Sequence, residues 1–482
     1  MSGADWVALL PLIFVGGMAV LVMVVIAVHR DHRLTLALTL IGLALAFASL
    51  WPAAAHIPRR VTPLLIVDRY ALFYLGLIIA AAFAVALLSY GYFEKCEGKH
   101  DEMYVLLLLG TLGSEVLVES THFVSFFLGL EILSVSLYGL TAYLRTRRLP
   151  LEAGIKYLVL AASSAAFLLF GVALVYAELG TMRFAEIASR LAAQPAASRV
   201  VLIAATALII TGIGFKLGVV PFHLWTPDVY EGAPAPVTAF IATVSKASMF
   251  AFLIRYFSQP GWEHTRQLYA VFAIIAIASM LAGNLLALMQ RNVKRILAYS
   301  SIAHFGYLLV AFLAGGLYAI QAVTFYLVAY IITTLGAFGI VAVLSDGTRD
   351  ADQMEDYRGL FWRRPVLATI FTLMILSLAG IPLTAGFLGK FYIVAAGASA
   401  SVWALIVILA VTSVIGLFYY LRIVVALFAE VPQGAESAGG ARVSAPLLGG
   451  YTLVVLAILL VWFGVYPTGL ITLIQTAARG LG

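Results

Sequence analysis

The sequence contains a single cysteine, Cys96, which excludes a disulfide bond within the chain. One thiol also falls short of the four thiolates that hold an iron–sulfur cluster. The sequence shows no glycine-rich dinucleotide fingerprint, no Walker A lysine and no HExxH pair. It also shows no clustered carboxylates or paired cysteines that would form a metal site. We therefore predict that this chain binds no nucleotide, redox cofactor or metal ion by itself.

Charged residues are scarce. They make up 11% of the 482 residues, whereas hydrophobic residues make up 63% and the mean hydropathy is +1.05. Soluble domains contain about 25% charged residues, so this composition predicts an integral membrane protein embedded in the lipid bilayer. The formal net charge of +6 is better explained by loop arginines that face anionic lipid than by a nucleic-acid surface.

Fourteen apolar segments are candidates for membrane-spanning helices, each of which needs about 20 residues. The expected fold class is therefore an all-α integral membrane protein with about 14 transmembrane helices. Residues 181–197 have the pattern of a short amphipathic helix at the surface. The predicted spans are 7–28, 34–54, 70–93, 103–118, 121–143, 151–178, 199–221, 235–257, 268–289, 296–315, 317–344, 365–396, 402–429 and 447–475.

The seventh and twelfth spans contain residues that break helices. Pro221 follows Lys216 in the seventh span, and Gly380 and Pro382 precede Lys390 in the twelfth. Paired broken helices in two halves of a chain indicate inverted repeats with a site at the breaks. The breaks lie five helices apart, which gives the two repeats opposite topology. We predict one membrane domain over 1–482, divided into three N-terminal helices (1–93), a first repeat of helices 4–8 (103–257), a second repeat of helices 9–13 (268–429) and a last helix (447–475).

The distribution of basic residues predicts the orientation. Loops that follow odd-numbered helices hold fifteen Lys and Arg residues, including Lys294, whereas even-numbered loops and the termini hold nine, including Arg255. Positive loops remain in the cytoplasm. The odd-numbered loops are therefore expected in the cytoplasm and both termini outside it.

Ionisable residues inside the apolar spans are the main functional signal. Lys216, Lys246 and Lys390 lie deep in their spans, and Glu131 lies near the middle of the fifth helix. Each charge near the bilayer centre costs roughly 2.5–3.5 kcal/mol on insertion scales. Burial disfavours the charged form of an amine, so such a group can take up and release a proton. The alternative interpretations are lysines that reach the interface and a structural carboxylate that Ser134 and Tyr138 satisfy.

Four further ionisable residues give weaker signals. Lys156 lies only about six residues into the sixth helix, where it either reaches the interface or modulates a neighbouring acid. His304, on the tenth helix, is either a hydrogen-bonded core residue with Ser300 and Tyr307 nearby or a proton relay. Glu115 and Glu119 flank the end of the fourth helix, and the sequence does not decide between an exit pathway and a solvated surface.

Four long motifs carry a resemblance to a known family. They are EAGIKYLVLAASSAAFLLFG (152–171), GFKLGVVPFHLWTPDVYEGAPAPVTAFIATVSKA (214–247), RNVKRILAYSSIAHFGYLL (291–309) and LAGIPLTAGFLGKFY (378–392). With them, nearly the whole chain resembles the antiporter-like membrane subunits of respiratory complex I. Lysine at position 390 distinguishes the chain from family members that have a glutamate there.

The resemblance implies roles for particular residues. Glu131, Lys216, Lys246 and Lys390 match the proton-transfer residues of the family, while Lys156 and His304 match relay or modulating positions. It also implies a multi-pass subunit of the bacterial inner membrane, in contact with neighbouring antiporter-like and small membrane subunits. Flavin mononucleotide (FMN), iron–sulfur clusters and quinone would belong to partner subunits. A subunit of a multi-chain sodium/proton antiporter is the alternative, and a purely structural scaffold is a third possibility that the buried lysines disfavour.

Overall fold

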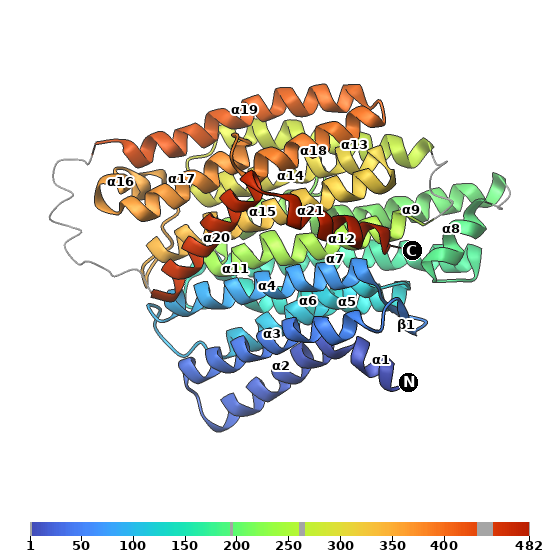
Figure 1. The fold of residues 1–482 in the computed structure, drawn as a ribbon, viewed down its shortest axis with the longest axis horizontal. Helices are drawn as coiled ribbons and strands as arrows, with labels where there is room; N and C mark the ends of the chain where they lie inside the picture. Colours follow the sequence, from blue (N-terminus) through green and yellow to red (C-terminus); the bar gives the residue numbers. More distant parts are fainter. Residues whose placement is uncertain (1, 193–195, 260–265, 431–446, 482) are drawn as a thin grey trace.

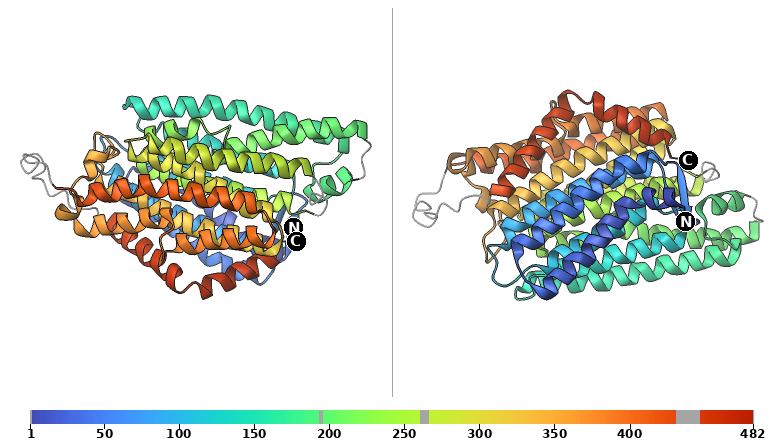
Figure 2. Two further views of the ribbon diagram at one scale, coloured as in Figure 1. Left: turned by 90° about the horizontal axis from the view of Figure 1, so that it is seen from above. Right: turned by 60° about the horizontal axis from the view of Figure 1, so that its bottom comes forward.

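The computed structural model describes residues 2–192, 196–259, 266–430 and 447–481. Most of them lie in helices that run alongside one another, roughly along the long axis of the molecule (Figures 1 and 2). Both termini lie at one end of the bundle, which we call the terminal end. A small antiparallel hairpin lies at this end, formed by β1 (Arg59–Thr62) and β2 (Leu65–Val67). The sequence patterns did not predict this hairpin.

The helices of the first part of the chain follow the predicted spans closely. They are α1 (Gly3–Ala8), α2 (Leu10–Val28), α3 (His32–Ala54), α4 (Arg69–Phe93), α5 (Glu102–Glu119), α6 (Phe123–Thr141), α7 (Arg148–Leu179), α8 (Phe184–Ala192), α9 (Ala196–Leu217), α10 (Trp225–Gly232), α11 (Ala235–Phe240), the π-helical turn η1 (Ile241–Ser245) and α12 (Lys246–Phe257). The predicted surface helix over 181–197 is observed as α8, and residues 193–195 lie outside the described residues.

The second part of the chain continues the same pattern. It contains α13 (Arg266–Leu288), α14 (Val293–Ala314), α15 (Gly316–Leu344), the 3-10 turn η2 (Met354–Tyr357), α16 (Leu360–Arg363), α17 (Pro365–Ala379), α18 (Ala385–Ser399), α19 (Trp403–Phe428), α20 (Leu447–Val465) and α21 (Thr468–Arg479). The last predicted span, 447–475, is therefore two helices, because Pro467 precedes α21 and lacks the N–H that would continue α20.

The predicted membrane fold is confirmed. In the described part of the chain, twelve helical segments are long and apolar enough to cross a membrane. The two remaining predicted spans are α5, which carries three acidic residues, and the pair α17 and α18. The first predicted span starts as two pieces, α1 and α2, since Pro11 lies at the start of α2. The boundaries of the two repeats remain a prediction.

Both predicted breaks are present, and the backbone groups that they free have partners. α9 ends at Leu217, and Gly218 follows with a φ of +71°. The indole of Trp225 donates to the carbonyl oxygen of Phe215 at 2.8 Å, and the N–H of Val220 donates to Ser279 Oγ at 2.9 Å. Side chains thus supply partners for backbone groups at the break, which is what a break inside a membrane requires.

The second break follows the same rule. α17 ends at Ala379, and Gly380 follows with a φ of +87°. The N–H of Gly386 donates to Ser377 Oγ at 3.2 Å, and the Lys390 ammonium donates to the carbonyl oxygen of Ala379 at 2.9 Å. One of the predicted site residues therefore also satisfies the end of the helix that precedes the break.

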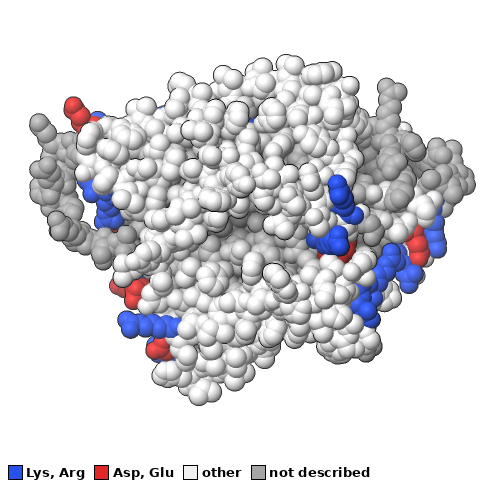
Figure 3. Space-filling model, in the orientation of Figure 1, with Lys and Arg blue, Asp and Glu red and all other residues white. Residues whose placement is uncertain are grey.

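The centre and the surface of the bundle differ in composition. The segment from α11 to α12 is buried along its whole apolar window, and α14 and α15 are nearly as enclosed. On the face shown in Figure 3, charged side chains gather toward the two ends and leave a broad uncharged band between them. This pattern is typical of a protein whose middle lies in lipid.

Candidate functional site

Lys216 lies at the C-terminal end of α9, immediately before the first break. Its ammonium is buried and donates to Ser134 Oγ on α6 at 3.0 Å and to the hydroxyl of Tyr157 on α7 at 3.1 Å. It also lies over the ring of Tyr157, 5.5 Å from the centroid. Hydroxyl groups both donate and accept hydrogen bonds, so these partners can accommodate either an ammonium or a neutral amine.

Glu131 lies one turn before Ser134 on α6 and is half-buried. Its carboxylate is within electrostatic range of Lys216 but forms no ion pair with it, because the distance between the Lys216 ammonium and the nearest carboxylate oxygen exceeds 4.0 Å. The alternative in which Ser134 donates to the Glu131 carboxylate is wrong, because Ser134 Oγ donates to the carbonyl oxygen of Leu130 at 2.6 Å and accepts from Lys216. Ser134 therefore contacts Lys216 directly, while Glu131 interacts with Lys216 only electrostatically.

Lys246 is the first residue of α12, after the π-helical turn η1. Its side chain is 0% exposed and donates to Ser301 Oγ on α14 at 2.8 Å. The rings of Phe305 and Tyr230 flank the ammonium, with centroids at 4.9 and 5.4 Å. Single π-helical turns occur frequently at functional sites, and this one was not foreseen from the sequence.

His304 on α14 is held between two tyrosines from other helices. Its Nδ1 bonds to the hydroxyl of Tyr326 on α15 at 2.6 Å, and its Nε2 bonds to the hydroxyl of Tyr420 on α19 at 2.9 Å. The expected partners were Ser300 and Tyr307. Ser300 instead bonds to Tyr420, and Tyr307 contacts the imidazole only through its ring. A histidine with hydroxyls on both ring nitrogens can take a proton on one side and release it on the other.

Tyrosines connect these groups. The hydroxyl of Tyr330 donates to Ser301 Oγ at 2.8 Å, so Lys246 and Tyr330 share one serine. The ring of Tyr330 lies 5.6 Å from that of His304, centroid to centroid. Polar side chains thus continue from Lys246 on α12 to the imidazole on α14.

Lys390 lies on α18, after the second break, and is less enclosed than Lys216 and Lys246. Its ammonium donates to the carbonyl oxygen of Ala379 and lies 5.3 Å from the centroid of the Tyr307 ring. The same Tyr307 ring lies 5.5 Å from the imidazole of His304. The structure therefore places Lys246, His304 and Lys390 around one cluster of serine and tyrosine side chains.

Lys156 lies outside this group. Its side chain on α7 is 44% exposed and forms ion pairs with Glu152 and Asp228, each at 2.9 Å. Burial alone would raise the pKa of the Asp228 carboxyl group, but hydrogen bonds from Lys156 and Arg295 outweigh burial and lower this pKa. The structure thus places Lys156 in a charged cluster at the end of the bundle away from the termini.

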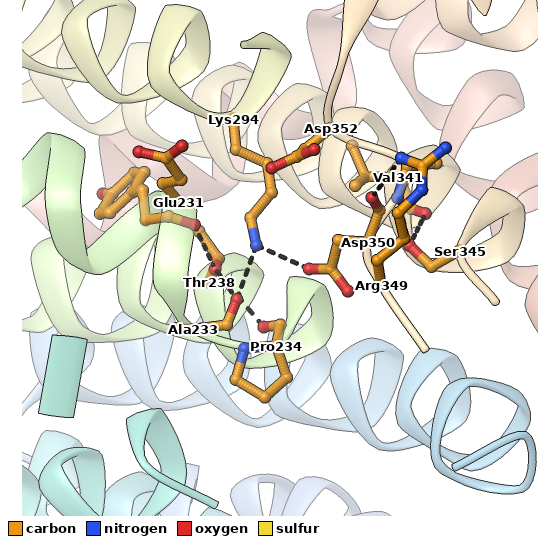
Figure 4. Close-up of polar contacts among 12 residues, drawn as sticks. Glu231, Ala233, Pro234, Thr238, Lys294, Val341, Ser345, Arg349, Asp350 and Asp352 are labelled. Carbon is orange, nitrogen blue, oxygen red and sulfur yellow. Dashed lines mark hydrogen bonds and ion pairs between the residues drawn. The ribbon is translucent and has the colours of Figure 1, made fainter. Parts of the chain in front are cut away.

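The structure also reveals buried ion pairs that the sequence analysis had assigned to loops. Lys294, near the start of α14, is 0% exposed and donates to Asp350 and to the carbonyl oxygen of Ala233, both at 2.6 Å (Figure 4). Arg255, near the end of α12, is buried and binds both carboxylate oxygens of Asp68, at 2.7 and 2.9 Å. Lys294 has polar neighbours in the sequence, whereas Arg255 lies at the end of an apolar run, and in both cases the partner is distant in the sequence.

Metal binding gains no support from the described residues. Among them, no group of three or more His, Cys, Asp or Glu side chains could hold a metal ion. The buried ionisable groups around the breaks are mainly amines, which repel cations when they are charged.

Comparisons with known proteins identify the family of the chain. Residues 120–416 match the family described as NADH:quinone oxidoreductase/Mrp antiporter, transmembrane. A curated relative, NADH-quinone oxidoreductase subunit N of Nitrosospira multiformis, is 52% identical and aligns with 99% of this chain and 97% of its own length.

Two solved structures have the same fold. A chain of respiratory complex I from Thermus thermophilus with bound Aureothin is 32% identical and superposes with a TM-score of 0.81 over 96% of this chain and 98% of its own. A chain of the Mrp complex from Dietzia sp. DQ12-45-1b superposes with a TM-score of 0.85 over 99% of this chain and 97% of its own, but at 22% identity it shows the fold alone. With its family match and its full-length relatives, the chain belongs to the NADH:quinone oxidoreductase/Mrp antiporter transmembrane family.

Proposed function

We propose that this chain is the N-type membrane subunit of a bacterial NADH-quinone oxidoreductase and carries one of its proton channels. Partner subunits oxidise NADH and reduce quinone, and they hold the FMN and the iron–sulfur clusters. This chain contributes no electron transfer, so its place in the enzyme is that of a proton translocase. The full-length similarity to a curated subunit N and to a chain of complex I supports this assignment.

One observation carries the proton-channel role. Among the ion pairs of the described residues, none includes Lys216, Lys246 or Lys390. An ammonium buried without a counter-ion is costly in free energy. A retained amine of this kind in a membrane is typical of a proton pathway, and three of them in one bundle, two beside its breaks, exceed what a scaffold requires.

The proposed route begins at Lys216, which exchanges protons with the cytoplasm. A shift of charge in a neighbouring subunit moves Glu131 toward or away from Lys216, and this changes how strongly the amine holds its proton. The proton then passes through water and hydroxyl groups to Lys246, along the serine and tyrosine cluster to His304, and on to Lys390. Lys156 modulates the entry side through its ion pair with Asp228. The broken helices supply the polar lining of the route.

The membrane orientation belongs to the same proposal. The terminal end faces away from the cytoplasm, and the opposite end, which contains the Lys294–Asp350 ion pair, faces the cytoplasm. The excess of basic residues in the odd-numbered loops supports this orientation. The two halves of the route then correspond to the predicted repeats 103–257 and 268–429.

Proton pumping by the assembled enzyme tests the role of the entry pair. Lys216→Ala and Glu131→Ala are each compared with Lys99→Ala, a change at an exposed loop lysine. NADH-driven acidification of inverted membrane vesicles is measured in sodium-free buffer, and NADH–ferricyanide reduction reports the amount of assembled enzyme. We expect acidification to fall about 10²-fold in the two site variants, as for loss of a positioned proton-transfer group. Undiminished pumping in both would refute the proposal, and pumping that requires added sodium would favour the antiporter alternative.

A further inference from the structure

Two glutamates outside the proposed route are fully buried and have no partner. Glu115 and Glu119 on α5 are each 0% exposed. In the described part of the chain, none of their four carboxyl oxygens has a hydrogen-bond partner. Buried polar groups nearly always have partners, so these two carboxyl groups need an explanation other than packing.

Their position follows from how α5 lies against the segment α11–α12. A Cβ atom added at Gly110 would lie 3.0 Å from the Phe240 ring, and the carbonyl oxygen of Val118 accepts from Arg255 Nε at 2.9 Å. The earlier residue of α5 contacts the earlier residue of α11–α12, and the later residue contacts the later one, so the two segments run in the same direction. Lys246 lies between Phe240 and Arg255, and Glu115 lies between Gly110 and Val118. The amine and this carboxyl group are therefore at a similar depth in the bundle.

Glu119 lies on α5 closer to the terminal end than Glu115. It lies four residues after Glu115, which places both side chains on one face of α5. It is within electrostatic range of Glu115 and of the Arg255–Asp68 pair. Arg255 already binds both oxygens of Asp68 and the carbonyl of Val118. Glu119 is thus not needed as its counter-ion, although the guanidinium is close enough to stabilise a carboxylate there.

Arg255 also lines a pocket at the terminal end. This pocket has a volume of about 470 Å³, and its polar lining includes Arg60, Thr121, Arg183, Glu186, Arg255 and Gln259. The hairpin β1–β2 and helix α8 form its walls, and both lie at this end of the bundle (Figure 1). Arg255 therefore lies both in the wall of this pocket and within electrostatic range of Glu119.

The chemistry of the pair fits proton carriage better than cation binding. An isolated carboxylate without hydrogen bonds is very costly to bury, whereas a neutral carboxylic acid is much less so. The nearby guanidinium repels a metal cation but stabilises the carboxylate that remains after a proton leaves. A site of this kind alternates between an acid and an ion, which is what a proton relay does.

We propose that Glu115 and Glu119 form an outlet that carries protons from the depth of Lys246 to the pocket at the terminal end, with Arg255 as its gate. Both groups rest as neutral acids. Glu119 first releases its proton to water in the pocket, and Arg255 stabilises the carboxylate left behind. An O–H bond then re-forms on Glu119 as that of Glu115 breaks, and the O–H bond of Glu115 re-forms, through water, as an N–H bond of the Lys246 ammonium breaks. Each cycle moves one proton, and no bond of the chain changes.

This inference rests on the proposed function, and the experiment separates the two. Glu115→Gln and Glu119→Gln keep the shape of the side chain and remove the exchangeable carboxyl proton. Glu97→Gln, at an exposed loop position, is the matched control, Glu119→Asp tests rescue, and Lys246→Met reports the main route. The readouts are NADH-driven acidification and the amount of assembled enzyme, given by NADH–ferricyanide reduction.

We expect both glutamine variants to assemble and to pump about twofold more slowly, because protons at Lys246 are then left with only the route through His304 and Lys390. The aspartate variant should recover at least part of the rate. Normal pumping in both glutamine variants, with Lys246→Met inactive, would overturn the outlet and leave the proposed function intact. Normal pumping in all three would overturn the proposed function. An aspartate variant as slow as Glu119→Gln would show that shape, not the proton, matters at this position.

Discussion

Two lysines of this protein are equally buried and have opposite surroundings. Lys246 and Lys294 are both 0% exposed. Lys294 contacts the carboxylate of Asp350 and the carbonyl of Ala233, so its charge is compensated (Figure 4). Lys246 contacts a serine hydroxyl and two aromatic rings, and none of the ion pairs of the described residues includes it. Burial alone therefore does not distinguish a structural lysine from a functional one, whereas the counter-ion does.

The comparison also separates two energetic roles. A buried ion pair is strongly destabilised when one partner is removed, because the other charge is left alone. A buried amine without a counter-ion is itself a cost, and its removal relieves that cost. Lys294 should therefore matter for folding and little for pumping, and Lys246 the reverse.

The largest expected effect is that of Lys246→Met on pumping. Methionine fills a similar volume but carries no proton, so NADH-driven acidification should fall about 10²-fold. The assembled enzyme should be as abundant as the wild type, because no partner charge is stranded. The ratio of acidification to NADH–ferricyanide reduction gives the result directly. A variant that pumps normally, or one that fails to assemble, would remove the distinction between the two lysines.

The second expected effect is a loss of stability in Lys294→Met. Asp350 would lose its cation while it is still partly buried, which costs about 3–5 kcal/mol. The amount of assembled enzyme and its melting temperature in detergent should both fall, while pumping per assembled enzyme stays near the wild-type level. In the double variant Lys294→Met/Asp350→Asn no charge is stranded, so part of the lost stability should return. A double variant no more stable than the single one would contradict the ion-pair explanation.

The sequence correctly placed Lys246 inside a helical span and misplaced Lys294 in a loop, for a physical reason. Lys246 stands alone in an apolar run, and no local feature except function or snorkelling explains it. Lys294 lies among Arg291, Asn292 and Arg295, which is the signature of a loop. Its partner Asp350 is 56 residues away. Sequence patterns record local polarity and do not record tertiary pairing, and Arg255 with Asp68 was missed for the same reason.

The fold was easier to predict than the contacts of the site. Spans and breaks depend on apolar length, glycine and proline, which are local properties. Both breaks and most spans therefore agree with the structure to within a few residues, although the span predicted over 447–475 is divided at Pro467. The partners of His304 come from α15 and α19, far along the chain, whereas the expected partners were its own helical neighbours. The carboxyl groups of Glu115 and Glu119 remained undecided because their exposure depends on how α5 packs against α12.

The smallest expected effect is that of Gly218→Ala, a change in the backbone beside the Lys246 ammonium. A Cβ atom added at Gly218 would lie 2.5 Å from Thr226 Oγ1 and 3.1 Å from Lys246 Nζ, at a φ of +71°. Gly180 has a left-handed backbone with a φ of +65°, and the nearest atom to its added Cβ lies at an ordinary contact distance of 3.7 Å. Both alanine variants should lose about 1–2 kcal/mol of stability from the left-handed backbone. Gly218→Ala should in addition pump about tenfold more slowly, because it displaces the amine, and small misplacements of a reacting group are costly in rate. Equal pumping by the two variants would mean that the position of the Lys246 ammonium does not limit proton transfer, and the contrast with Lys294 would then rest on charge alone.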